Sequence, residues 1–185
     1  FAPQWIFWLG ITNTFLILWW QQAALPEREW EFLIFIYLMA LNGGALALRE
    51  YFAKDKTKEW LQPRWTRAVL TIATIFPMFI PIFVFIVEPE RATSSVLIAA
   101  AAGTIGHILL YVCYRHKIKD MWSLAVTVLS LCIIAETTGF KLFAENFYDL
   151  DFFMFLVMGF MTLGIFTAAV IYLRKTAEAF EVDNV

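Results

Sequence analysis

Two ionisable side chains lie inside long apolar stretches of this sequence, and they are the residues best suited to do chemistry there. His107 lies in the stretch 94–115, which carries no charge before its last residue, and Glu136 lies in the stretch 121–138. An imidazole has an unperturbed pKa of about 6.5 and can relay protons near neutral pH. A carboxylate inside a membrane is costly and is therefore a candidate ion or proton site. These two residues predict an ion or proton function within a bilayer.

Two asparagines extend this polar set. Asn13 and Asn42 fall near the middle of the first and second apolar stretches. With a helical rise of about 1.5 Å per residue, both lie close to the bilayer midplane, as does His107. Transporters bind their substrates at this depth. Glu136 lies nearer the outer surface, so we do not expect it to contact His107 directly.

Each of these four residues also has a purely structural interpretation. Polar side chains in membrane helix bundles often hydrogen-bond a neighbouring helix, each contributing about 0.6 kcal/mol. His107 is then a neutral imidazole bonded to a facing helix, for example to Asn42. Glu136 then faces water near the surface or pairs with Lys141. The functional and the structural interpretation both stay open at this point.

The sequence predicts no cofactor, metal or catalytic residue. A haem between helices usually needs two axial ligands. The chain has two histidines, and His116 lies in a basic turn where it cannot share an iron with His107. A membrane hydrolase needs a nucleophile with its base, or two metals, at one depth. One histidine and one carboxylate at different depths do not provide this, so a lipid-active enzyme ranks third among the functional hypotheses.

The elements that position these residues are six apolar stretches of bilayer length. The chain has 185 residues, of which 61% are hydrophobic and 16% charged, whereas soluble domains are about 25% charged. Each stretch is close to the roughly 20 residues that cross the hydrocarbon core. The sequence therefore predicts an all-α fold, a polytopic transmembrane helix bundle forming a single domain over residues 1–185. The six predicted spans are about 4–20, 30–48, 68–87, 94–114, 121–138 and 152–173.

Two features of the middle stretches predict close packing and a bend. Gly103 and Gly106 belong to a run of small residues, which lets another helix approach closely. Pro77 and Pro81 lie four residues apart and share one face of the predicted helix 68–87. We expect them to kink it, as bilayer helices allow where neighbours satisfy the freed carbonyls.

Lys and Arg residues concentrate in alternate connections between the stretches. The stretch 49–67 carries six and the connection 115–120 carries three, whereas the connections on the other side carry one each. Because cytoplasmic loops are enriched in these residues, both termini are predicted to be cytoplasmic. Aromatic residues interleaved with the charges predict a short amphipathic segment in this loop, and the acidic tail after residue 175 is expected to fray. The predicted cytoplasmic basic loop contains Lys54, Lys56, Lys58, Arg64 and Arg67.

The charge pattern and the spans define the functional hypotheses. The formal net charge of −2 says little, because the distribution of charge matters more in a membrane protein, and no part of the sequence resembles a nucleic-acid-binding surface. The first hypothesis is a multi-pass integral membrane protein that mediates ion or small-solute permeation as a homo-oligomer. The alternative is an accessory or assembly subunit of a larger membrane complex. The expected partners are membrane lipids and other membrane subunits, in a cytoplasmic or other energy-transducing membrane.

Overall fold

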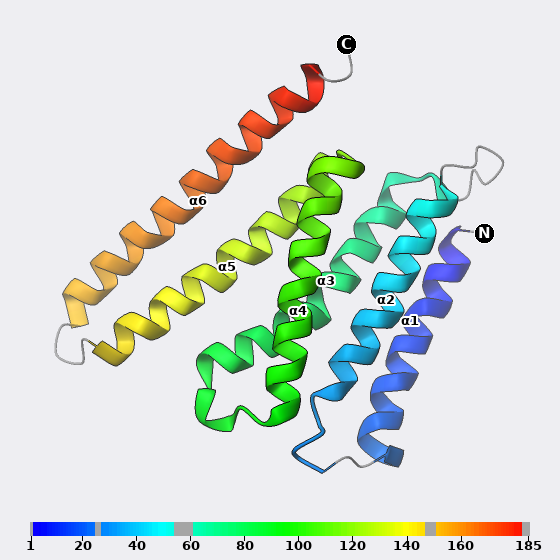
Figure 1. Ribbon diagram of the computed structural model, residues 1–185, viewed down its shortest axis with the longest axis horizontal. Coiled ribbons are helices and arrows are strands. Elements are labelled where there is room, and N and C mark those ends of the chain that lie inside the picture. Colours follow the sequence, from blue (N-terminus) through cyan, green and yellow to red (C-terminus); the bar gives the residue numbers. More distant parts are fainter. Residues whose placement is uncertain (1, 25–26, 54–60, 147–150, 183–185) are drawn as a thin grey trace.

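The computed structural model describes residues 2–24, 27–53, 61–146 and 151–182, and these residues form helices and short connections without a strand (Figure 1). Shorter turns follow α1, α3 and α4, at Trp20–Ala24, Pro89–Arg91 and Cys113–Lys117. The six long helices are α1 (Ala2–Trp19), α2 (Leu33–Phe52), α3 (Arg64–Val87), α4 (Ser94–Val112), α5 (Met121–Asn146) and α6 (Asp151–Val182).

By length and composition, five helices in the described part of the chain are able to cross a membrane. They are compatible with the predicted integral membrane location, and the all-α prediction agrees with the structure. They occupy Leu33–Phe52, Arg64–Val87, Ser94–Lys117, Met121–Glu145 and Phe155–Glu181. α1 has 18 residues but is not among them, because Gln4, Asn13 and several tryptophans lower its mean hydropathy. The sixth span and the orientation of the termini stay predictions.

Two helices extend well beyond their predicted spans. α5 continues past the predicted end at residue 138, and α6 continues past residue 173 to Val182. Ion pairs between side chains four residues apart support the added turns, Lys141 with Glu145 at 3.2 Å and Arg174 with Glu178 at 3.3 Å. The expectation of a frayed tail is therefore wrong as far as Val182. Hydropathy marks where a helix leaves the apolar layer, not where it ends.

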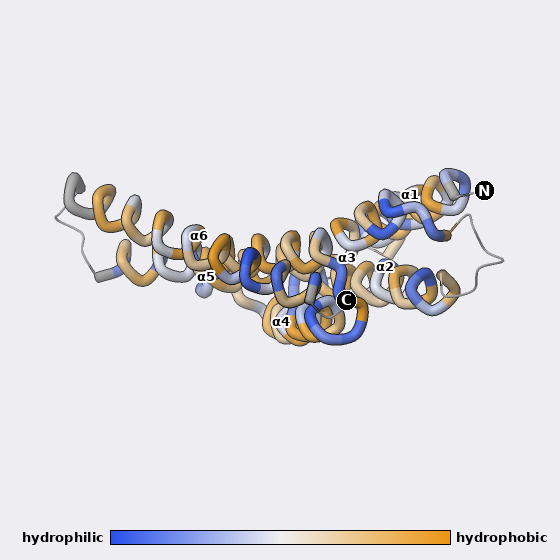
Figure 2. Tube along the Cα trace, turned by 90° about the horizontal axis from the view of Figure 1, so that it is seen from above, coloured by the Kyte–Doolittle hydropathy of each residue, from blue (hydrophilic) through white to orange (hydrophobic). Residues whose placement is uncertain are grey.

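The helices form an elongated, shallow arrangement with α3 at its centre (Figures 1 and 2). α3 packs against α2, α4 and α5, whereas α1 contacts mainly α2 and α6 packs on α5. Seen from above, α1 and α2 lie at one end of the layer and α5 and α6 extend to the other (Figure 2). Apolar side chains such as Phe7 and Phe15 on α1 and Phe160 on α6 stay exposed. Such a surface is typical of helices that contact lipid.

The closest packing in the layer is between α3 and α4. A Cβ atom added at Gly103 would lie 2.4 Å from the backbone oxygen of Met78, and one added at Gly106 would lie 2.5 Å from the Met78 side chain. The prediction that small residues on this face admit a neighbouring helix is therefore confirmed. α3 remains helical through Pro77 and Pro81, both of which are buried. The kink at these prolines stays a prediction.

Gly103→Ala is expected to destabilise the protein, because the added methyl group would overlap the backbone of α3. Overpacking of this kind costs about 1–3 kcal/mol, so the melting temperature in mild detergent should fall by several degrees. Gly44→Ala is the matched control, because a Cβ atom at Gly44 meets nothing within 4 Å. Equal melting temperatures for the two variants would contradict the close contact.

Candidate functional site

The predicted polar residues do not converge on one site. The structure places them in three separate hydrogen-bonded pairs, each between two neighbouring helices. The pairs are Asn13 with Asn42 (α1 to α2), His107 with Ser130 (α4 to α5), and Thr162 with Glu136 (α6 to α5). The sequence predicted a polar layer at similar depth, whereas in the structure these side chains lie in separate contacts at three different helix interfaces.

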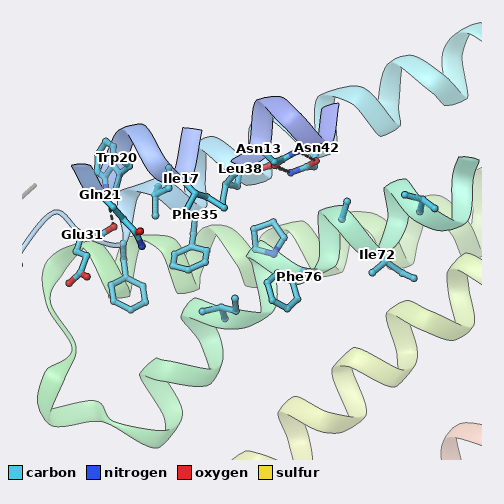
Figure 3. A pocket seen from close by; sticks show the side chains of 17 residues that line it. Asn13, Ile17, Trp20, Gln21, Glu31, Phe35, Leu38, Asn42, Ile72 and Phe76 are labelled. Atoms are coloured by element: carbon cyan, nitrogen blue, oxygen red, sulfur yellow. Dashed lines mark hydrogen bonds between the residues drawn. The ribbon is translucent and has the colours of Figure 1, made fainter. Parts of the chain in front are cut away.

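The Asn13–Asn42 pair is closed on itself (Figure 3). The Nδ2 of Asn13 donates to Asn42 Oδ1 at 3.0 Å, and the Nδ2 of Asn42 donates to Asn13 Oδ1 at 2.7 Å. Each Nδ2 also donates at 2.8 Å to a backbone carbonyl of its own helix, Leu9 or Leu38. Both hydrogens of each amide are therefore used, whereas each side-chain oxygen can accept a second bond. The pair can accept further hydrogen bonds but has no donor left.

Both ring nitrogens of His107 are engaged in the buried interface between α4 and α5. Nδ1 lies 2.9 Å from the Gly103 carbonyl oxygen, and Nε2 lies 2.9 Å from Ser130 Oγ. A carbonyl only accepts, so Nδ1 carries the hydrogen, and in the neutral ring Nε2 accepts from the Ser130 hydroxyl. His107 therefore contacts a facing helix, which is the kind of contact that its structural interpretation expected. The suggested partner Asn42 is wrong, because Asn42 is bonded to α1 and Ser130 of α5 faces the ring.

Glu136 lies half-buried between α5 and α6, where the hydroxyl of Thr162 donates to its Oε1. The suggested partner Lys141 pairs with Glu145 instead. Thr162 Oγ1 also lies 3.0 Å from the Met158 carbonyl oxygen. The single hydroxyl hydrogen of Thr162 is therefore shared between two acceptors, the Glu136 carboxyl group and a carbonyl of its own helix.

A charged network that sequence reasoning missed joins α2, α3 and the start of α5. Arg67 Nε lies 2.7 Å from Glu50 Oε1, and Arg67 Nη1 lies 2.8 Å from Asp120 Oδ1. Arg49, which is 2% exposed, contacts the same Glu50 oxygen at 2.7 Å. Asp120 also accepts the backbone N–H of Ser123 at 3.0 Å and so caps α5. The sequence signal was Asp120 itself, three residues before a serine at the start of an apolar stretch.

The structure describes only part of the predicted basic loop. Lys54, Lys56 and Lys58 lie outside the described residues, and with them most of the proposed amphipathic segment. Arg64 begins α3 with an exposed side chain, whereas Arg67 is half-buried in ion pairs. Arg67 therefore holds α2, α3 and the α4–α5 connection together at one end of the layer.

Asp120 has a pKa below its usual range. Burial alone would raise the pKa, but hydrogen bonds from Ser123 and the nearby positive charge of Arg67 favour the ionised carboxylate and outweigh it. The ionised form is therefore part of the folded structure at this end of α5.

A groove of about 850 Å³ lies between α1, α2 and α3 (Figure 3). Its walls are mostly apolar, and the Asn13–Asn42 pair lines it at mid-helix. Trp20, Gln21 and Glu31 line it together near the connection between α1 and α2. Sequence reasoning did not predict this groove. Its apolar lining residues include Ile17, Phe35, Leu38, Ile72 and Phe76.

No group of three or more His, Cys, Asp or Glu side chains in the described ranges is placed to hold a metal ion. Comparison with protein-family models, with curated proteins and with solved structures gives no match to this chain. The groove, the interhelical pairs and the exposed helix surfaces are the features of this structure that bear on its function.

Asn13 and Asn42 should show strong energetic coupling. Replacing one of them by Leu leaves the other amide without its partner, which costs about 1–3 kcal/mol. The double variant removes both polar groups and should lose less stability than the two single variants combined. Melting temperatures of the four proteins in one detergent measure this coupling, and strictly additive losses would show that the pair does not hold α1 to α2.

Asp120→Asn and Asp120→Ala should separate the ion pair from the helix cap. Asn keeps an N-cap acceptor and loses only the charge, whereas Ala loses both, at a further cost of about 0.5–2 kcal/mol. Since the pKa of Asp120 is lowered on folding, the carboxylate stabilises the protein fully above the ordinary value of 3.8, and this contribution is lost as the pH falls through the lower folded-state value. The advantage of the wild type over Asp120→Asn should therefore shrink in acid. An advantage that is independent of pH would rule out the ionised pair.

Proposed function

We propose that this protein works as a subunit of a larger membrane assembly, formed in the first place by copies of its own chain. The observation that supports this proposal most directly is the exposed surface of α6. None of the residues in its most apolar part is buried, although α6 is long and apolar enough to cross a membrane. α5 is the helix on which it packs, so most of its circumference is available to another chain.

The exposed surface of α6 has a feature that suits helix association. Gly164 and Ala168 lie four residues apart, are both exposed, and therefore share one face. A Cβ atom at Gly164 would meet nothing within 4 Å, so the backbone of α6 is open to close approach there. Small residues at this spacing promote tight contacts between membrane helices.

The polar pairs support assembly more than a permeation path within one chain. His107 and the two asparagines are bonded between neighbouring helices, with their donors in use. Such pairs hold helices together, and in the described part of the chain they lie at three separate interfaces. Permeation by a homo-oligomer is the second candidate, and Glu136 favours it, because its carboxyl group lies half-buried between two apolar helices.

Native mass spectrometry in mild detergent tests the assembly. The wild type should appear as a homo-oligomer, and Gly164→Leu should raise its dissociation constant about tenfold or more, since a side chain would hold the helices apart. Gly159→Leu is the matched control, because Gly159 also has open space around it but is not in line with Ala168.

A wild-type monomer without partners would overturn the proposal. A particle that contains other chains would identify an accessory subunit instead of a homo-oligomer. If Gly164→Leu leaves the oligomer unchanged, the interface between the copies does not include this face of α6. Cation or proton flux into proteoliposomes that disappears with Glu136→Gln would favour permeation as the role of the assembly.

A further inference from the structure

The groove between α1, α2 and α3 is open along one side. Phe76 and Ile72 of α3 line it and are 64% and 52% exposed, and Ile17 of α1 lines it and is 38% exposed. α2 and α3 are both long and apolar enough to cross a membrane. In a bilayer the open side of the groove therefore faces the acyl chains, and a molecule dissolved in the bilayer can enter it laterally.

The polar groups that line the groove at mid-helix are hydrogen-bond acceptors. The amide pair of Asn13 and Asn42 has used its donors on itself and on its own helices. Pro77 has no N–H to donate to the carbonyl of Ala73 four residues earlier, and both residues line the groove. This carbonyl lacks its regular helical partner on the groove-lining face of α3. Such a surface does not attract an anion, so an anionic headgroup is not expected to enter the groove as far as its middle.

The end of the groove near the α1–α2 connection combines a carboxylate with an aromatic ring. Glu31 and Trp20 both line it (Figure 3). The indole Nε1 of Trp20 donates to the backbone oxygen of Glu31 at 3.1 Å, which fixes the ring beside this residue. Glu27 and Glu29 outnumber Arg28 in the same connection, so the local charge is negative. The backbone of Glu31 is thus held beside the indole, and a carboxylate and an aromatic face each attract an ammonium group.

We infer that this groove binds one bilayer lipid with a primary ammonium headgroup, of the phosphatidylethanolamine type. The ammonium group lies at Glu31 and Trp20, at the level where tryptophans meet lipid headgroups. One acyl chain follows Phe35, Leu38 and Phe76 toward the amide pair. A volume of about 850 Å³ is within the range of small-molecule sites, so the second acyl chain stays in the bilayer.

Lipid retention measured by native mass spectrometry tests this site. Delipidated protein is mixed with phosphatidylethanolamine or with phosphatidylglycerol of identical acyl chains. We expect one phosphatidylethanolamine per chain, bound about tenfold or more tightly than phosphatidylglycerol. Glu31→Gln should remove this preference. Glu90→Gln should keep it, because Glu90 lies in the turn Pro89–Arg91 after α3 and does not line the groove.

A second pair of variants tests the position of the acyl chain. Gly10 lines the groove, and a Cβ atom there would meet nothing within 4 Å, so Gly10→Phe is expected to extend a ring from this open position into the space that the lipid would occupy. Retention of lipid should be lost while the melting temperature of the lipid-free protein stays the same. Gly44→Phe is the control, because Gly44 also has open space but does not line the groove.

Three results would overturn the inference. They are equal or tighter binding of phosphatidylglycerol, retention of phosphatidylethanolamine unchanged by Gly10→Phe, and absence of any stoichiometric lipid on the wild type. Lipid is counted per chain, so these results are independent of whether α6 forms an oligomer.

Discussion

A polar group without a partner in hydrocarbon costs several kcal/mol, and this constraint explains how the helices are joined. The four polar side chains that the sequence singles out at depth find partners on adjacent helices, whereas several threonines bond to their own helix. The amide pair joins α1 to α2, the imidazole joins α4 to α5, and the carboxyl group of Glu136 joins α5 to α6. The same atoms that would destabilise a lone helix in a membrane thus determine which helices become neighbours.

α3 is held by close backbone packing and by ion pairs, and it joins the two ends of the layer. Its backbone at Met78 approaches Gly103 of α4, and Arg67 at its start links Glu50 to Asp120. Its other face, around Pro77, forms a wall of the groove. One helix therefore provides tight packing on one side and an open apolar surface on the other. Pro77 lies on the groove side and has no N–H, so the carbonyl of Ala73 is left without its regular helical partner there.

The sequence predicted the helices well and their pairings poorly. Hydropathy located all six helices, because an apolar stretch of bilayer length is a strong local signal. It missed the added turns of α5 and α6, which depend on charged side chains beyond the apolar part. Depth along a helix was predictable from the rise per residue, but rotation and neighbours were not. Asn42 was at a suitable depth to meet His107, yet Ser130 and Asn13 are the actual partners. The groove was unpredictable for the same reason, since it depends on the separation of α1 from α3.

The loose attachment of α1 has a mechanical consequence. Among the described helices α1 contacts mainly α2, and a pair of amides near its middle is one of the polar links between them. A helix held largely by one neighbour can tilt relative to the rest of the layer. The half that carries Ile17 forms one edge of the groove, so a small tilt of α1 changes the width of the groove entrance. If α1 crosses a bilayer as predicted, a change in bilayer thickness that tilts it would also change the width of this entrance.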